Sequence, residues 1–195
     1  MNTVSSFIMQ KYSRQGLGSL FLTCAFPFHF WTLIFVFRDI SWLTERTNLW
    51  DAIGVASYGM VFALVESVMI FLVVALAGFF IPRWQSDQRI AFLGLLILIA
   101  SIWAMISQLL FLWNVSLPIQ AIQFLRNSGH ALRILYAVSL ATVTITILLP
   151  VYLFMRSQKA TTIMQCLMER LSLITMFYLI FDVVGLMIVI IRNIN

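Results

Sequence analysis

Charged side chains are scarce in this sequence: only 10% of its 195 residues are Asp, Glu, Lys or Arg. Soluble domains average about 25% charged residues, and a soluble domain of this length must keep a shell of charged residues at its surface. Apolar residues make up 62% of this chain instead. The shortage of charge therefore excludes an ordinary soluble domain and favours a chain whose surface faces lipid.

The motifs of common cofactor-dependent and hydrolytic sites are also absent. The sequence contains no C-x-x-C, H-E-x-x-H, G-x-S-x-G or Walker loop, so it lacks the signatures of the metal, hydrolase and nucleotide sites that these motifs build. Haem ligation by His29 would need a facing histidine, and the other histidine, His130, lies at the outer edge of its apolar stretch. We expect no metal and no cofactor.

The net charge of +5 does not indicate a nucleic-acid partner. Its basic residues are scattered at the ends of apolar stretches and form no basic stripe interleaved with aromatic residues. The expected surroundings are the lipid bilayer and other membrane subunits.

Five apolar stretches make up most of the chain, at residues 16–37, 52–81, 90–113, 131–155 and 171–191. About 20 helical residues cross the hydrocarbon core of a bilayer, and a lone strand cannot satisfy its backbone hydrogen bonds in lipid. The sequence therefore predicts an all-α integral membrane protein, a bundle of five transmembrane helices with short loops. No Gly/Ser-rich or Pro-rich linker divides it, so residues 1–195 are expected to form one membrane domain.

The longest predicted connection covers residues 114–130. It has two readings: an ordinary loop, or a short interfacial helix that starts at Pro118, is capped by Ser116 and ends near Gly129.

Basic residues in the loops favour an N-terminus inside the cell and a C-terminus outside, in the cytoplasmic membrane. On that orientation the inner segments hold seven basic residues: Lys11, Arg14, Arg83, Arg89, Arg156, Lys159 and Arg170. The outer segments hold five: Arg38, Arg46, Arg126, Arg133 and Arg192.

Two apolar stretches carry a lone carboxyl group near the middle, Glu66 and Asp182. Ionisable groups at that depth are costly in lipid and tend to face protein, water or a partner. We expect Glu66 and Asp182 to face one shared interior, with at least one of them protonated, because two close carboxylates cannot both ionise cheaply in a dry site. The full set of intramembrane polar candidates is Glu66, Asp182, His29, Thr142, Gln108 and Tyr178.

Each candidate also has a purely structural interpretation. Small and polar residues fall on one face of most stretches, such as Gly59, Ala63 and Ser67 beside Glu66, and membrane helices pack through such faces. Asp182 shares its face with Thr175, Tyr178 and Gly185. His29 follows Pro27 and is interpreted chiefly as a hydrogen-bonding group at a loosened helical turn.

The leading functional hypothesis is a non-enzymatic accessory or assembly subunit in the membrane. It rests on short loops, missing cofactor ligands and abundant apolar surface. The alternative is a small proton- or ion-coupled transporter that uses Glu66 and Asp182. A weaker alternative is a lipid-modifying enzyme working with polar groups inside the membrane.

Overall fold

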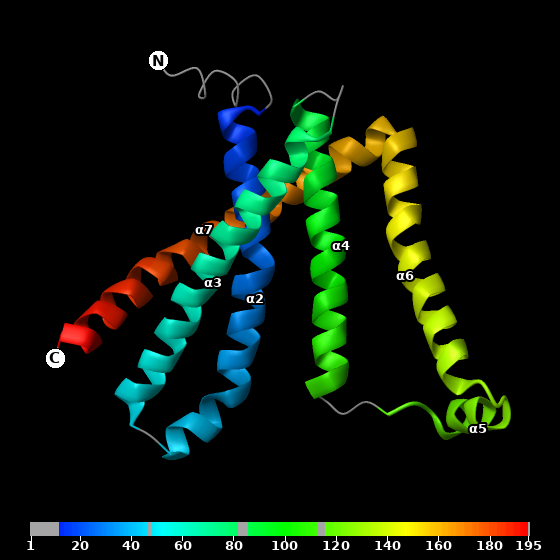
Figure 1. The fold of residues 1–195 in the computed structure, drawn as a ribbon. Helices are drawn as coiled ribbons and strands as arrows, with labels where there is room; N and C mark the ends of the chain where they lie inside the picture. The colour runs from blue at the N-terminus through cyan, green and yellow to red at the C-terminus, as the bar shows by residue number, and fades with distance from the viewer. Residues whose placement is uncertain (1–11, 47, 82–85, 113–115, 195) are drawn as a thin grey trace. The chain divides into compact units, whose positions relative to one another are not determined.

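The computed structural model of the protein describes residues 12–46, 48–81, 86–112 and 116–194. Within these ranges, residues 40–44 and 111 are described by their backbone alone. Within these ranges the chain forms six α-helices and no strand. The helices are α2 (Arg14–Arg46), α3 (Leu49–Phe79), α4 (Ser86–Leu112), α5 (Ile119–Asn127), α6 (Ala131–Arg156) and α7 (Gln158–Ile194) (Figure 1). Five of them are long and apolar enough to cross a membrane, which confirms the predicted fold class.

Two helices extend by more than eight residues beyond the spans that the sequence predicted. Helix α2 continues to Arg46 and α7 begins at Gln158, so most of the expected polar connections at 38–51 and 156–169 are helical. For α7 the reason is local: residues 158–170 contain neither glycine nor proline, and Lys, Gln, Glu, Leu and Met all favour helix. Polar residues marked the ends of the predicted membrane spans, but the helices continue through these polar residues.

The short helix predicted between the third and fourth spans is confirmed as α5. Pro118 occupies its N-cap position without a side-chain hydrogen bond, so the expected cap from Ser116 is wrong. Gly129 follows the helix with a φ of 68°, a left-handed conformation that glycine adopts without steric cost. None of the α5 residues is buried.

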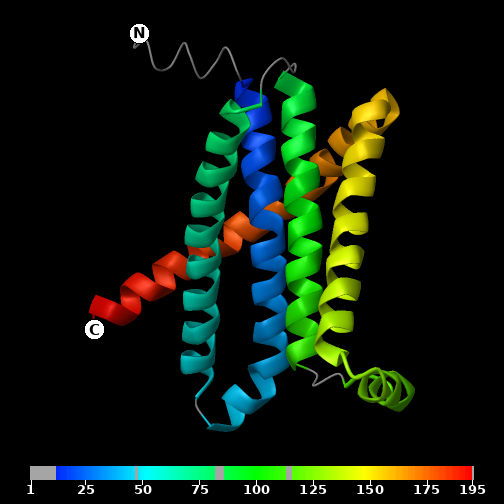
Figure 2. The same ribbon diagram turned by 45° about the vertical axis from the view of Figure 1, so that its right-hand side comes forward.

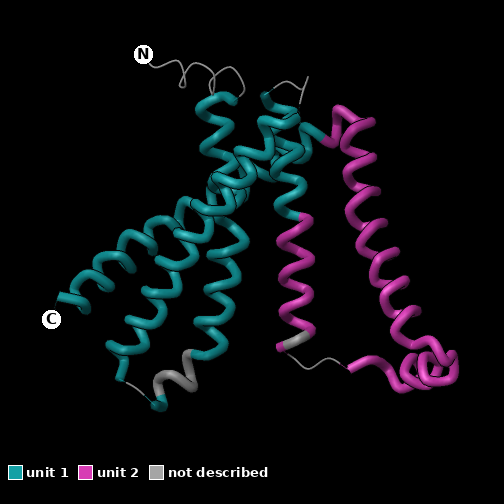
Figure 3. The backbone as a smooth tube through the Cα atoms, in the orientation of Figure 1, with its two compact units in different colours: residues 1–98, 161–195 teal, residues 99–160 magenta. Residues whose placement is uncertain are grey.

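The chain divides into two compact units, residues 1–98 with 161–195 and residues 99–160 (Figure 3). The boundaries fall inside α4 and α7 and not in a linker. The single membrane domain over residues 1–195 stays a prediction.

In the first unit, α2 and α3 run side by side (Figures 1 and 2). Small residues form the inward face of α3, where Ala63 is 1% and Ser67 0% exposed. This is the packing face that the small-residue spacing predicted, and it lets the two backbones approach closely.

Helix α7 runs obliquely across α2 in both views (Figures 1 and 2). Its buried residues recur every three, four or seven positions: Met164, Met168, Ser172, Thr175, Asp182 and Gly185. Met168 lies against Gly94 of α4, where an added Cβ would be 2.6 Å from its sulfur. Gly185 lies against α3, where an added Cβ would be 3.3 Å from the carbonyl oxygen of Ser57. One face of α7 thus contacts three other helices of this unit.

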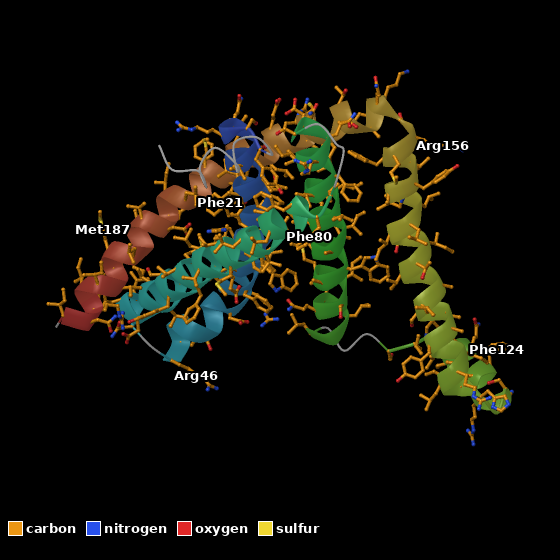
Figure 4. All side chains as sticks on the ribbon, turned by 45° about the horizontal axis from the view of Figure 1, so that its top comes forward. Phe21, Arg46, Phe80, Phe124, Arg156 and Met187 are labelled. Atoms are coloured by element: carbon orange, nitrogen blue, oxygen red, sulfur yellow. The ribbon has the colours of Figure 1, made fainter. Side chains whose placement is uncertain are left out.

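In the second unit, most of α6 is exposed or half-buried, and Phe154 is its buried residue. The indole N–H of Trp103 on α4 donates a 3.0 Å hydrogen bond to the hydroxyl of Thr146. Large apolar side chains are exposed over both units, including Met187 in the first unit and Phe124 in the second (Figure 4). Such surface is costly in water and suits contact with lipid.

Candidate intramembrane polar site

The most enclosed contact between two polar side chains in the described residues joins α2 to α7. Nε2 of His29 lies 2.8 Å from Oδ2 of Asp182, and the two side chains are 0% and 2% exposed. Their positions are 153 residues apart in the chain. An isolated charge at this place would carry a large desolvation cost, so the contact defines how α2 and α7 pack.

The other ring nitrogen of His29, Nδ1, has a contact that determines its own protonation. Nδ1 lies 2.8 Å from the backbone carbonyl oxygen of Ala25. A carbonyl oxygen accepts hydrogen bonds and has no proton to donate, so Nδ1 carries the proton. The remaining nitrogen, Nε2, faces Asp182 and is where the protonation state can differ.

Proline contributes to the placement of His29. Pro27 lies inside α2 and is buried. It has no amide hydrogen, so the helical hydrogen bond to the carbonyl group of Thr23 is missing. The histidine therefore sits next to a turn of α2 that lacks one backbone hydrogen bond.

An aromatic ring covers the histidine. The rings of His29 and Tyr178 are stacked, with centroids 6.0 Å apart and planes at 10°. Phe26 in turn stacks on Tyr178, with ring centroids 6.4 Å apart. Tyr178 precedes Asp182 by one helical turn, so the shared face predicted for α7 brings both side chains to the same histidine.

The second carboxyl oxygen of Asp182 is an exception to the general pairing of buried polar atoms. Oδ1 is buried, and no group in the described part of the chain donates a hydrogen bond to it. Asp182 therefore keeps one unused acceptor in an otherwise closed interior.

Glu66 does not share this interior. Its side chain is exposed near the middle of α3, whereas Ala63 and Ser67 on the neighbouring face are buried. The expectation that Glu66 and Asp182 face one common site is therefore wrong. Ser67 is one position further along, and 100° per residue turns Glu66 away from the packed face.

The two remaining candidates lie in the second unit. Thr142 is exposed and donates a 2.8 Å hydrogen bond to the carbonyl oxygen of Val138 in its own helix. Gln108 is exposed on α4. Neither is brought to His29 or Asp182 by a described contact, and their functional role stays a prediction.

Sequence reasoning missed the polar contacts at the C-terminal end of α7. Arg192 donates a 2.7 Å hydrogen bond to Asp51 and a 2.6 Å bond to the carbonyl oxygen of Trp50. Both partners belong to the first turn of α3. Asp51 and Arg192 looked like loop charges, and only the crossing of α7 over α3 shows that they meet.

A second missed contact lies at the start of α2. Tyr12 is 1% exposed, donates a 2.8 Å hydrogen bond to the carbonyl oxygen of Ala75 and packs edge-on against Phe79. Burial raises the pKa of the Tyr12 hydroxyl, and the positive charge of Arg89 partly offsets this rise. Tyr12 therefore connects the beginning of α2 to the end of α3.

The same end of the first unit holds a polar cavity of about 320 Å³. Its walls include Ser19 of α2, Asp87 of α4, and Gln165 and Glu169 of α7. Both carboxyl groups are exposed. In the part of the chain that the structure describes, no three His, Cys, Asp or Glu side chains come close enough to hold a metal ion.

Fold and site together are those of an α-helical, multi-pass integral membrane protein with a buried His–Asp contact between two of its spans. Comparison of the chain with protein families, curated proteins and solved structures finds no match.

Proposed function

We propose that the protein is a non-enzymatic, membrane-embedded accessory or assembly subunit that binds another membrane protein through the outward face of α3. The observation that carries the proposal is the exposure of Glu66 in the middle of this helix. A carboxyl group is poorly solvated by lipid, so this face favours contact with protein.

The neighbours of Glu66 give the face its character. Phe62, Val65, Met69 and Val73 are 66%, 54%, 61% and 60% exposed. Glu66 is thus a single polar group inside an apolar surface. This arrangement suits a partner helix that packs apolar side chains against the surface and supplies one hydrogen-bond donor at mid-depth.

Site-specific photo-crosslinking in native membranes tests the proposal. A photoreactive residue at Met69 is expected to give one discrete cross-linked product, while the same residue at Met187, on the exposed surface of α7, serves as a control. Glu66→Leu should remove the product from Met69, because the donor on the partner loses its acceptor. Glu66→Gln should keep it, because the amide oxygen still accepts.

Two results would count against the subunit function. One is a product from Met69 that is unchanged by Glu66→Leu. The other is a monodisperse monomer after gentle extraction, with no product from Met69.

A second candidate, a proton- or ion-coupled transporter, is favoured by the buried contact of His29 with Asp182. The transporter predicted from the sequence used Glu66 and Asp182, whereas in the structure the residue beside Asp182 is His29. Intramembrane acids and histidines are typical of proton relays. If pH-dependent flux into liposomes is the same for Asp182→Asn and the unmodified protein, this candidate fails.

The cytoplasmic membrane is the proposed location, with the N-terminus inside and the C-terminus outside. The bias of seven basic residues against five supports this orientation. Lys11 and Arg83, which belong to that count, lie outside the described residues. Cysteine accessibility at exposed positions near each terminus of the chain tests it.

A further inference from the structure

The protons held by His29 and Asp182 can be counted from geometry alone. The carbonyl oxygen of Ala25 requires a proton on Nδ1. The 2.8 Å separation of Nε2 and Oδ2 is a hydrogen bond and requires one proton between these atoms. That proton can belong to either residue, and in both cases the pair has no net charge.

A net charge of zero is what a closed site of this kind favours. The side chains are 0% and 2% exposed, and burial of an uncompensated charge is costly. The pair can nevertheless take one more proton, because no group in the described part of the chain donates to Oδ1 of Asp182. Protonation at Oδ1 leaves an imidazolium beside a neutral carboxyl group.

We propose that His29 and Asp182 form a proton-binding site that connects α2 to α7 when neutral and releases this connection when it takes up one further proton. The added proton forms an O–H bond at Oδ1, and the shared proton stays on Nε2. The site then carries one positive charge without a counter-ion, and the imidazolium is stabilised only where water or lipid headgroups can reach it.

The charged groups on the surrounding helices do not compensate this charge. On α7 the ring of Tyr178 stacks on His29, and on α2 the thiol of Cys24 is buried one turn and a half before it. On α3, Asp51 pairs with Arg192, Tyr58 bonds to Asn193, and Glu66 is exposed. On α4, Asp87 and Arg89 lie in its first turn.

The surrounding packing allows a local movement of α2 against α7. Pro27 removes one backbone hydrogen bond from α2 at the turn before His29. The contacts of Gly185 with Ser57 and of Arg192 with Asp51 hold the far end of α7 on α3. Release at Asp182 therefore separates the middle of α7 from α2 while the helix end stays in place.

The test uses the full-length chain in lipid nanodiscs, with spin labels at exposed positions Phe30 of α2 and Phe181 of α7 after replacement of Cys24 by Ala and Cys166 by Ser. Acidification from about pH 8 to about pH 2 spans the usual pKa values of His and Asp side chains. We expect the distance between the labels to lengthen. Proton uptake is measured on the unlabelled protein in the same nanodiscs.

The decisive variant is the double substitution His29→Gln with Asp182→Asn, which keeps a hydrogen-bonded pair but removes both titrating groups. It should show no lengthening and take up about one proton fewer per chain than the unmodified protein. Glu66→Gln is the matched control, since it removes a mid-span carboxyl group outside the site, and it should keep the lengthening.

Two results would overturn the proposal: a lengthening that persists in the double variant, or an uptake by the double variant equal to that of the unmodified protein. If the double variant does not fold, His29→Gln alone decides. Its amide can still bond to Asp182 but cannot become a cation, so the acid-induced lengthening should be lost, and its retention would also overturn the proposal.

Discussion

Asp182 and Glu66 occupy similar places in the sequence and opposite places in the structure. Each is the only carboxyl group near the middle of an apolar span. Asp182 lies on the packed face of α7, where it is 2% exposed and bonded to His29. Glu66 lies on the outward face of α3, among exposed apolar side chains. The difference shows that depth in the membrane does not decide the role of a carboxyl group.

The phase of each helix decides it instead. Asp182 follows Thr175 by seven residues and precedes Gly185 by three, and all three are buried. Glu66 is next to Ser67 in the sequence, yet only Ser67 belongs to the buried stripe of α3. Asp182 therefore takes part in internal packing, whereas Glu66 is exposed and is the group through which the proposed function expects a partner to bind.

The substitution with the largest expected effect is Asp182→Ala. It leaves the buried Nε2 of His29 without a partner and opens a cavity, which we expect to cost about 3 kcal/mol of unfolding free energy, the lower end for a broken buried pair. Unfolding of the purified protein in mixed micelles measures this. Glu66→Ala is the control and should cost little. Equal losses for the two variants would remove the distinction between the two carboxyl groups.

The crossing of α7 over α3 gives the next effect. A Cβ on Gly185 would lie 3.3 Å from the carbonyl oxygen of Ser57, so the side chain in Gly185→Leu meets backbone that cannot easily give way. We expect a loss of about 2 kcal/mol. Gly18→Leu is the matched control, because a Cβ there meets nothing within 4 Å. A stable Gly185→Leu protein would mean that the crossing is looser than described.

A smaller effect is expected for Tyr12→Phe, which removes the hydrogen bond to the carbonyl oxygen of Ala75 and should cost about 1 kcal/mol. The pKa of Tyr12 is raised in the folded protein, so the neutral hydroxyl contributes to the unfolding free energy. This contribution is fully present below the pKa of the unfolded chain, about 10, and is lost as pH rises through the pKa of the folded protein. Stability should therefore fall at alkaline pH in the unmodified protein and fall less in Tyr12→Phe.

The smallest effect on folding is expected for Glu66→Gln. The side chain is exposed, and exposed substitutions change stability by less than about 0.5 kcal/mol. The isolated protein should unfold as the unmodified one does. A large loss would place Glu66 in an internal contact and would contradict the assignment of its face to a partner.

The fold class and the existence of the five spans could be predicted from hydropathy, because lipid permits few backbone arrangements. The extensions of α2 and α7 could not, since apolar length marks the membrane core and not the helix. The spacing of Thr175, Tyr178 and Asp182 correctly predicted a shared face. The partner of Asp182 could not be predicted: helical phase does not say which helix faces α7, and His29 stands 153 positions away.

The phase of Glu66 shows the same limit. Gly59, Ala63 and Ser67 predicted a packing face beside it, and Ala63 and Ser67 are buried. Whether a residue at the border of such a face turns inward depends on the angle at which the neighbouring helix crosses. That angle is set by side-chain packing between helices, which one helix sequence does not contain.

A double-mutant cycle between His29 and Asp182 tests the central claim most directly. Unfolding free energies are measured for His29→Ala, Asp182→Ala and the double variant in the same micelles. If the buried contact joins α2 to α7, the second substitution should cost less once the first is present, with a coupling of about 1 kcal/mol or more. Costs that add to within about 0.5 kcal/mol would show that the two side chains do not interact, and would contradict this account.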